Sequence, residues 1–155
     1  MLNRALRTME VDLIIKMGFF VRDLHQHLVT LHSEQYDEHH HLNTFPVYRG
    51  QGLSQTHFDQ LMQTKDGLMS FNNFLSTSLD QSVSLAFAES NQDNADLIGI
   101  LFEITISLSI SSTHFANVRN VSAYQKEEEI FLSMHSVFRI EQIKKNTMGI
   151  IIFDR

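Results

Sequence analysis

The sequence Tyr-Gln-Lys-Glu-Glu-Glu-Ile-Phe-Leu at residues 124–132 places three consecutive carboxylates directly before an apolar run that is typical of a β-strand. Because alternate side chains of a strand share a face, Glu127 and Glu129 point to one side and Glu128 to the other. Two carboxylates on one face repel each other, which raises the pKa of one of them. Acid–base and cation-stabilising sites use such pairs. A solvated turn before a strand is the plainer interpretation, and the triplet alone does not exclude it.

The overall composition is that of an ordinary globular protein. The 155 residues are 43% hydrophobic and 19% charged, so we expect one domain with one buried core over residues 1–155. The net charge of −6 argues against a nucleic-acid partner, which a basic stripe would indicate. The lack of cysteine excludes disulfides, thiolate chemistry and cysteine-ligated zinc. No apolar run is long enough to predict a membrane span or a signal peptide.

The first third of the chain is predicted to be helical. Apolar residues recur at spacings of three and four from Leu13 to Leu31, which indicates a packing face. Gly18 interrupts this stripe and weakens the helix by about 1 kcal/mol relative to alanine. Residues 37–41, Asp-Glu-His-His-His, resemble a metal-binding cluster in composition. Adjacent histidines cannot all face one ion, so we interpret this run as a polar loop and expect no metal.

Strands and short helices are predicted from Phe45 onward. We expect two helices with polar N-caps. One covers residues 54–62 with Ser54 as its N-cap, and the other covers residues 82–90 and is capped by Asp80. In the second helix Leu85, Ala86 and Ala88 are expected to pack, with Phe87 on another face. The expected strands have apolar or β-branched runs: 46–52 (ending in a glycine turn), 70–80, 95–110, 130–134, 137–143 and 148–153. Helices early and strands late predict an α+β fold with a largely antiparallel sheet.

Two further segments carry chemistry. Arg49 lies among apolar neighbours in a predicted strand, where it needs an anionic partner, either a ligand or a structural ion pair. Gly50 beside it lets a ligand approach the backbone closely. The hydroxyls of Ser76, Thr77 and Ser78 stand at a predicted strand end and can orient a carboxylate or a sugar hydroxyl, although such residues are also common on surfaces.

Taken in order, Val-Tyr-Arg-Gly at 47–50, Phe-Leu-Ser-Thr-Ser at 74–78 and Glu-Glu-Glu-Ile at 127–130 resemble the Arg–Ser–Glu motif of the mono-ADP-ribosyltransferases that modify arginine. The resemblance extends over residues 2–155 and includes Leu-Asn-Arg-Ala-Leu-Arg at 2–7. It implies an ADP-ribosyltransferase-like fold, in which an N-terminal helical part (residues 1–44) packs on two small, mainly antiparallel β-sheets. Those sheets, in the strand-rich core of residues 45–155, would form an NAD cleft.

The resemblance also implies roles for the residues that would hold NAD+. Arg49 matches the arginine that grips the NAD+ phosphates, which suits its fixed fork of donors. The backbone of Gly50 would meet the nicotinamide amide. Ser76 matches the serine that positions the catalytic glutamate, and Thr77 and Ser78 support that strand and complete the cofactor-binding set. Phe87 resembles the aromatic residue that stacks on nicotinamide.

The last motif implies the chemistry. Glu129 matches the catalytic glutamate, which bonds the ribose 2′-hydroxyl and stabilises the oxocarbenium ion as nicotinamide leaves. Glu127 matches the residue that orients the acceptor guanidinium and helps to deprotonate it. Residues 117–126 correspond to the target-recognition loop of the family, with Tyr124 as its aromatic residue.

The sequence therefore predicts a mono-ADP-ribosyltransferase that moves ADP-ribose from NAD+ to an arginine of a protein acceptor and releases nicotinamide. NAD+ is the expected co-substrate, without a metal. An NAD+ glycohydrolase and a catalytically silent NAD- or protein-binding module remain alternatives. The lack of cysteines favours a cytoplasmic enzyme or a toxin-like domain delivered into the cytosol. Because the chain opens as if in mid-helix, we expect it to be part of a longer protein.

Overall fold

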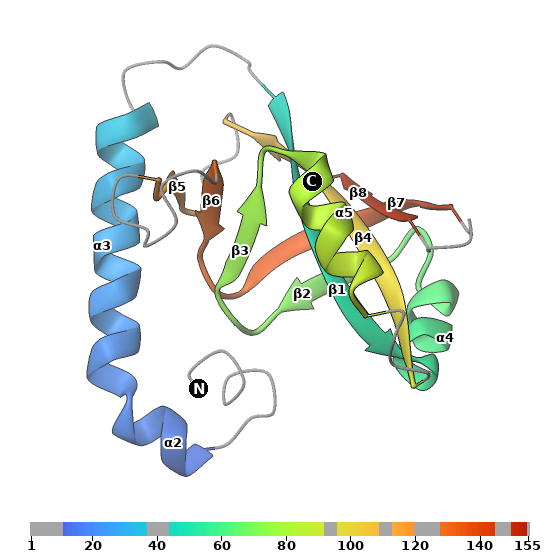
Figure 1. Cartoon of the computed structure of the whole chain (residues 1–155). Coiled ribbons are helices and arrows are strands. Elements are labelled where there is room, and N and C mark those ends of the chain that lie inside the picture. The colour runs from blue at the N-terminus through green and yellow to red at the C-terminus, as the bar shows by residue number, and fades with distance from the viewer. Residues whose placement is uncertain are drawn as a thin grey trace.

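The computed structural model describes residues 11–36, 44–91, 96–108, 113–119, 128–144 and 150–154. In these ranges the chain forms four helices and eight strands (Figure 1). The helices are α2 (Val11–Lys16), α3 (Gly18–Tyr36), α4 (Gln55–Gln63) and α5 (Gln81–Glu89). The strands are β1 (Thr44–Ser54), β2 (Leu68–Phe71), β3 (Leu75–Ser78), β4 (Leu97–Ser107), β5 (Phe115–Asn117), β6 (Glu129–Leu132), β7 (Ser136–Lys144) and β8 (Ile150–Asp154). The predicted α+β class is confirmed.

The strands are hydrogen-bonded in the order β2-β7-β8-β4-β1-β3-β6-β5. All neighbours are antiparallel except β4 and β8, which are parallel. In the described strands, β1 and β3 pair at one register position, Tyr48↔Ser78. The sheet therefore divides there into a five-strand part, from β2 to β1, and a three-strand part, from β3 to β5. The prediction of two mainly antiparallel sheets is confirmed in this form, and we call the place where β1 and β3 diverge the fork.

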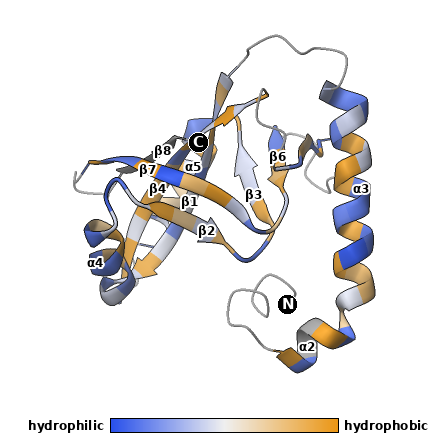
Figure 2. Cartoon of the chain, turned by 180° about the vertical axis from the view of Figure 1, so that it is seen from behind, coloured by the Kyte–Doolittle hydropathy of each residue, from blue (hydrophilic) through white to orange (hydrophobic). Residues whose placement is uncertain are grey.

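The main core lies on one face of the five-strand part. Val47 of β1 stands opposite Ile104 of β4 in the register, and both side chains are fully buried. Phe102 and Ile106 on the same face of β4 are equally buried. Figure 2 shows apolar residues on the strands of this part, whereas α4 is mostly polar. Arg49 lies on this face too, opposite Phe102, so its charge emerges at the margin of the core.

The other face of β1 and β4 is covered by α5, which contacts the strand backbone directly. A methyl group at Gly50 would lie 1.8 Å from the Ser84 carbonyl oxygen, and one at Gly99 would lie 2.2 Å from the Ala88 carbonyl oxygen. No side chain fits in either place, so glycine at these two positions allows the helix to reach the sheet. Ser84 and Ala88, the α5 residues at this contact, are buried.

Helix α3 packs on β5, the edge strand of the three-strand part (Figure 1). The Gln35 amide donates to the Asn117 carbonyl oxygen at 3.0 Å and accepts from the Asn117 N–H at 2.8 Å. His32 Nδ1 lies 2.8 Å from the Phe115 carbonyl oxygen. An edge strand leaves backbone groups open to another strand. Here two side chains of a helix bind those groups instead.

Several predictions of local structure are confirmed. The long helix breaks at Met17, just before Gly18. Ser54 caps α4 by accepting from the His57 N–H, and Asp80 caps α5 by accepting from the Ser82 N–H at 2.8 Å. Within the described part of the chain, no helix is both long and apolar enough to cross a membrane. The histidine run at 37–41 lies outside the described residues.

Three predictions were wrong. β1 does not end in a turn at its glycines but continues through Gly50 and Gly52 to Ser54, because β4 pairs with it along its whole length. The single strand expected over 70–80 is two strands that pair with different partners, β2 with β7 and β3 with β6. Ala86, expected to pack, is exposed because α5 turns Ser84 and Ala88 to the sheet instead.

Candidate active site

The fork brings together Arg49, Ser76 and Glu129, three residues that the sequence placed in separate motifs. Antiparallel pairing aligns Tyr48 with Ser78 and Ser78 with Glu129 across the three strands. Arg49 lies one residue past the Tyr48↔Ser78 pair and Ser76 two residues past it, where β1 and β3 separate. Residues separated by 27 and 53 positions along the chain thus meet in one site.

Two short hydrogen bonds connect these residues. The Ser76 hydroxyl donates to Glu129 Oε1 at 2.6 Å. Arg49 Nη1 donates to the backbone carbonyl oxygen of Ser76 at 2.7 Å, and Arg49 Nε donates to Gln51 Oε1 at 3.2 Å. Hydrogen bonds to charged groups are the strong class. The guanidinium is therefore oriented across the fork, and the carboxylate is oriented from one side by a serine.

Thr77 and Ser78 secure the strand that carries Ser76. The Thr77 hydroxyl is buried and donates to the Ile130 carbonyl oxygen at 2.7 Å, which fastens β3 to β6. The Ser78 hydroxyl accepts from the Asp80 N–H at 3.0 Å at the start of α5. These bonds agree with the supporting role predicted for the two hydroxyls, and their contact with a cofactor stays a prediction.

A cavity of about 300 Å³ opens beside the fork on the α5 side. Its lining includes the cofactor residues predicted from the sequence, apart from Glu129: Arg49, Gly50, Ser76, Thr77, Ser78 and Phe87. Phe87 is 56% exposed, so part of its side chain is open to a ligand. Burial, and then the Glu103 carboxylate on the next strand, raise the pKa of Tyr48, whose neutral phenol also lines this cavity. We call it the small cavity.

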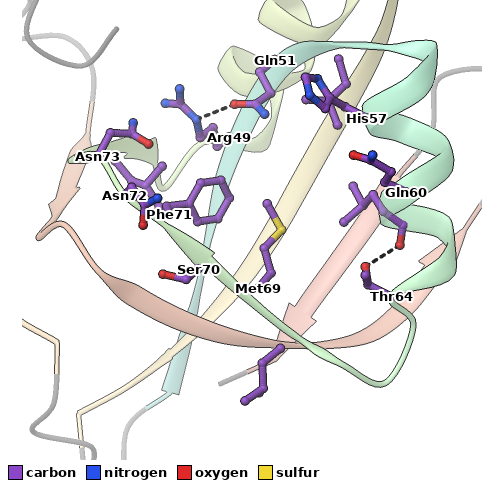
Figure 3. Close-up of a pocket in the computed structure, with 14 residues that line it drawn as sticks. Arg49, Gln51, His57, Gln60, Thr64, Met69, Ser70, Phe71, Asn72 and Asn73 are labelled. Atoms are coloured by element: carbon purple, nitrogen blue, oxygen red, sulfur yellow. Dashed lines mark hydrogen bonds between the residues drawn. The ribbon is translucent and has the colours of Figure 1, made fainter. Parts of the chain in front are cut away.

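A larger cavity of about 470 Å³ lies between α4, β1 and β2 (Figure 3). Arg49 lines it as well as the small cavity. Figure 3 shows His57 and Gln60 of α4 facing the strands from one side, with Arg49, Gln51 and Asn73 toward the other. Polar groups around an apolar floor are typical of a site for a small molecule. We call it the large cavity.

The polar residues of the large cavity were not predicted from the sequence. Gln51 stands two residues after Arg49 on the same strand face, so its proximity to the guanidinium was predictable once a strand was assumed. Asn73 carried no such signal, because its position depends on the break between β2 and β3. The Asn73 amide donates to the Phe74 carbonyl oxygen at 2.9 Å, which stabilises that break.

The remaining predicted site residues, Glu127 and Tyr124, lie outside the described residues. Glu129 begins β6 and Glu128 precedes it. The exposed Glu128 carboxylate forms an ion pair with Arg119 at 3.6 Å. Among the described residues, no group of three or more histidines or carboxylates is placed to hold a metal ion.

A comparison with models of protein families identifies the class of protein. The model of the family described as NAD:arginine ADP-ribosyltransferase matches residues 2–153. The chain belongs to this family. A comparison with curated protein sequences finds no significant match.

Solved structures of ADP-ribosyltransferases share the fold. Exoenzyme S from Pseudomonas aeruginosa, in complex with human 14-3-3 protein beta and bound to carba-NAD, matches with a TM-score of 0.67 and 16% identity. Plx2a, a toxin from Paenibacillus larvae, matches with a TM-score of 0.66 and 16% identity over 99% of this chain and 76% of its own. The eukaryotic enzyme ART2.2, in complex with NADH, has a TM-score of 0.61 and 20% identity.

The chain spans only part of the length of each of these relatives. The matches with Exoenzyme S and ART2.2 include 99% of this chain but only 64% and 57% of the other two chains. The match with the HopU1 ADP-ribosyltransferase of Pseudomonas syringae includes 46% of that chain.

Proposed function

We propose that the protein transfers ADP-ribose from NAD+ to an arginine side chain of a protein acceptor and releases nicotinamide. The convergence of Arg49, Ser76 and Glu129 at the fork is the observation that carries this proposal. An arginine beside the serine–carboxylate pair offers a phosphate ligand and a group that stabilises positive charge within one site. Family membership supports the same reaction class.

The two cavities that share Arg49 support NAD+ as the co-substrate. A dinucleotide is two nucleosides joined by a diphosphate, so it needs two compartments with a cation between them. In our proposal the nicotinamide end enters the small cavity, where Phe87 offers an aromatic face and the Gly50 backbone is accessible. The adenosine end occupies the large cavity, and the diphosphate lies against the Arg49 guanidinium, whose planar fork suits phosphate oxygens.

Ser76 and Glu129 then act on the ribose next to nicotinamide. As the bond from ribose C1′ to nicotinamide breaks, the electron pair leaves with nicotinamide and the sugar acquires oxocarbenium character. The Glu129 carboxylate stabilises that charge, as carboxylates do in glycoside hydrolysis. Because Ser76 already donates to Oε1 at 2.6 Å, the carboxylate needs little reorientation during the reaction. Glu127, in our assignment, accepts the proton that the acceptor guanidinium must lose, because a free guanidinium stays protonated at neutral pH.

The acceptor and the location complete the proposal. Glutamate at position 127 offers an anion to a guanidinium, which favours arginine over a neutral acceptor. We propose the cytoplasm as the location of the reaction, either in the producing cell or in a cell that receives the protein.

The experiment that tests the proposal combines labelled NAD+ with agmatine, a small guanidine. Transfer of label to agmatine is expected for the native protein, with a loss of about 10²–10³-fold in Glu129→Gln, because a neutral amide cannot offset developing charge. Glu127→Gln is expected to lose transfer but keep NAD+ hydrolysis.

Other outcomes would contradict the proposal in distinct ways. Nicotinamide release without labelled agmatine would indicate a glycohydrolase. NAD+ binding without turnover would indicate a silent binding module. Equal loss of transfer and hydrolysis in Glu127→Gln would refute the separate role of Glu127.

A further inference from the structure

A third cavity, of about 220 Å³, includes Glu129 but none of the residues that line the other two. Three leucines of α3, Leu24, Leu28 and Leu31, form one wall of it, and Val118 and Phe131 lie among its other lining residues. Phe131 stands two residues after Glu129 and so shares its strand face. We call this cavity the leucine groove.

The chemistry of the leucine groove is that of an apolar channel with a carboxylate. Among the described residues that line it, His27 is the other polar one, and it lies on the exposed side of α3. A ligand that fits must be apolar along its length and cationic at one end. The arginine side chain has this form, with three methylenes followed by a guanidinium that stays charged. Long cationic side chains commonly lay their stems along apolar surface and keep the charged end with a polar partner.

The position of the leucine groove relative to Glu129 and Ser76 matters for the reaction. Ser76 lines the small cavity, and its hydroxyl bonds the carboxylate that lines the groove. The Ser76–Glu129 pair therefore connects the small cavity and the leucine groove. A nucleophile that attacks ribose C1′ approaches from the side opposite the departing nicotinamide. With nicotinamide in the small cavity, an acceptor can approach ribose C1′ from the leucine groove.

We propose that the leucine groove binds the three-methylene stem of the acceptor arginine and presents its guanidinium at Glu129. This inference rests on the proposed function. In the reaction a bond forms between a guanidino nitrogen and ribose C1′, and the bond from C1′ to nicotinamide breaks with its electron pair on nicotinamide. One guanidinium proton is released to a carboxylate, Glu127 in our assignment. The leucines are positioning residues, which act on the acceptor and not on NAD+.

The test measures transfer kinetics for guanidines that differ only in alkyl length: methyl-, ethyl-, propyl- and butylguanidine. Each methylene buried in the groove is expected to lower KM for the guanidine by about fourfold, the factor that corresponds to burying one CH₂ group. The gain should level off beyond three carbons. The KM for NAD+ should stay unchanged along the series.

Two substitutions of half-buried Leu24 test the site itself. Leu24→Ala removes part of the wall and should reduce the gain per methylene, whereas Leu24→Trp fills the groove and should weaken the longer guanidines most. Val29→Ala is the matched control, because Val29 is a half-buried aliphatic residue of the same helix that lines none of the three cavities. Hydrolysis of NAD+ verifies that each variant keeps its fold and its NAD+ site.

The results separate this inference from the proposed function. Transfer to methylguanidine with a KM that does not depend on alkyl length would overturn the groove and leave the proposed function intact. The same conclusion would follow if Leu24→Ala and Val29→Ala changed the alkyl dependence equally. Nicotinamide release without labelling of any guanidine would overturn both.

Discussion

Helices α5 and α3 both contribute walls to the candidate site, but opposite kinds of contact hold them in place. α5 reaches the sheet through backbone contact, where Gly50 and Gly99 leave no room for any side chain. α3 reaches β5 through side chains, because Gln35 and His32 bond the backbone of the edge strand. The first contact is between packed backbones, and the second is made by side chains through hydrogen bonds and ring packing on Phe115.

The difference indicates how each wall can respond to change. A contact between packed backbones has little freedom, since interiors are close-packed and transmit strain. The wall of the small cavity is therefore expected to keep a fixed shape. The contact between α3 and β5 includes hydrogen bonds and imidazole rings, so its strength depends on the protonation of those rings. The wall of the leucine groove is expected to be the adjustable one.

The largest expected effect comes from Gly50→Ala, which disrupts the contact between packed backbones. Its methyl group would lie 1.8 Å from the Ser84 carbonyl oxygen, with the Ala88 nitrogen at 2.7 Å. Because the obstructing atoms are helix backbone, α5 has to move off β1. We expect a loss of about 3 kcal/mol in the free energy of unfolding, at the upper end for overpacking, together with weaker NAD+ binding. Urea unfolding and NAD+ titration measure the two effects.

Gly52→Ala is the matched control for that prediction. The three atoms nearest to its methyl group would all belong to the Asn91 side chain, with Oδ1 at 2.6 Å. A side-chain amide can rotate away, whereas a helix backbone cannot. A loss of stability as large as that of Gly50→Ala would contradict the assignment of the effect to the α5 backbone.

A smaller effect is expected from Gln35→Leu, which disrupts the contact made by side chains. The substitution leaves the Asn117 N–H and carbonyl groups of β5 without their side-chain partner. Unpaired backbone groups at a partly buried edge cost about 1–2 kcal/mol in the free energy of unfolding. Hydrogen exchange at the Asn117 amide should accelerate more than exchange in β4.

Gln26→Leu provides the comparison for Gln35→Leu. Gln26 is exposed on the same helix, so the two substitutions change helix propensity and polarity alike. Equal exchange rates at Asn117 in both variants would show that the Gln35 contact does not hold the edge strand.

The packing of α5 on Gly50 was not predictable from local sequence, whereas the strands that carry the candidate site were, for physical reasons. Alternation and motif order were sufficient to predict that Arg49, Ser76 and Glu129 lie on strands, because strand geometry fixes which side chains share a face. Gly50 was interpreted as an opening for a ligand. The structure assigns its missing side chain to α5 packing, a long-range contact that no local pattern contains.

The contact between α3 and β5 could not be predicted from local sequence either. His32 and Gln35 lie 83 and 82 residues from their partners in β5, and β5 itself has only three residues. A strand so short gives almost no periodic signal. The nine histidines include six outside the run at 37–41, all in the described part of the chain. Three of these, His25, His32 and His114, are brought together by the fold and form a cluster of rings.

The smallest expected effect is a pH dependence that arises in this histidine cluster. The His114 ring lies 5.5 Å from the His32 ring and 5.9 Å from the His25 ring, measured between centroids. Burial, then His32 and His25, lower the pKa of His114 from its ordinary value of 6.5. The unfolded chain therefore binds a proton at this position more readily than the folded chain does. Stability from this group is complete above pH 6.5 and is lost as the pH falls through the lower folded pKa.

Urea unfolding between pH 5 and 8 measures this dependence, with His114→Gln as the informative variant. The variant should lose part of the decline in stability that the native protein shows on acidification, because it removes the proton-binding ring from the α3–β5 interface. Hydrogen exchange at Asn117 should likewise become less sensitive to acid, whereas exchange beneath α5 should not change. His135→Asn is the control, since His135 is exposed in a turn with φ of 62°, a conformation that asparagine tolerates. If both variants kept the native pH profile, the acid sensitivity would originate outside the contact between α3 and β5. The difference between the two helices would then depend on the Gln35 hydrogen bonds alone.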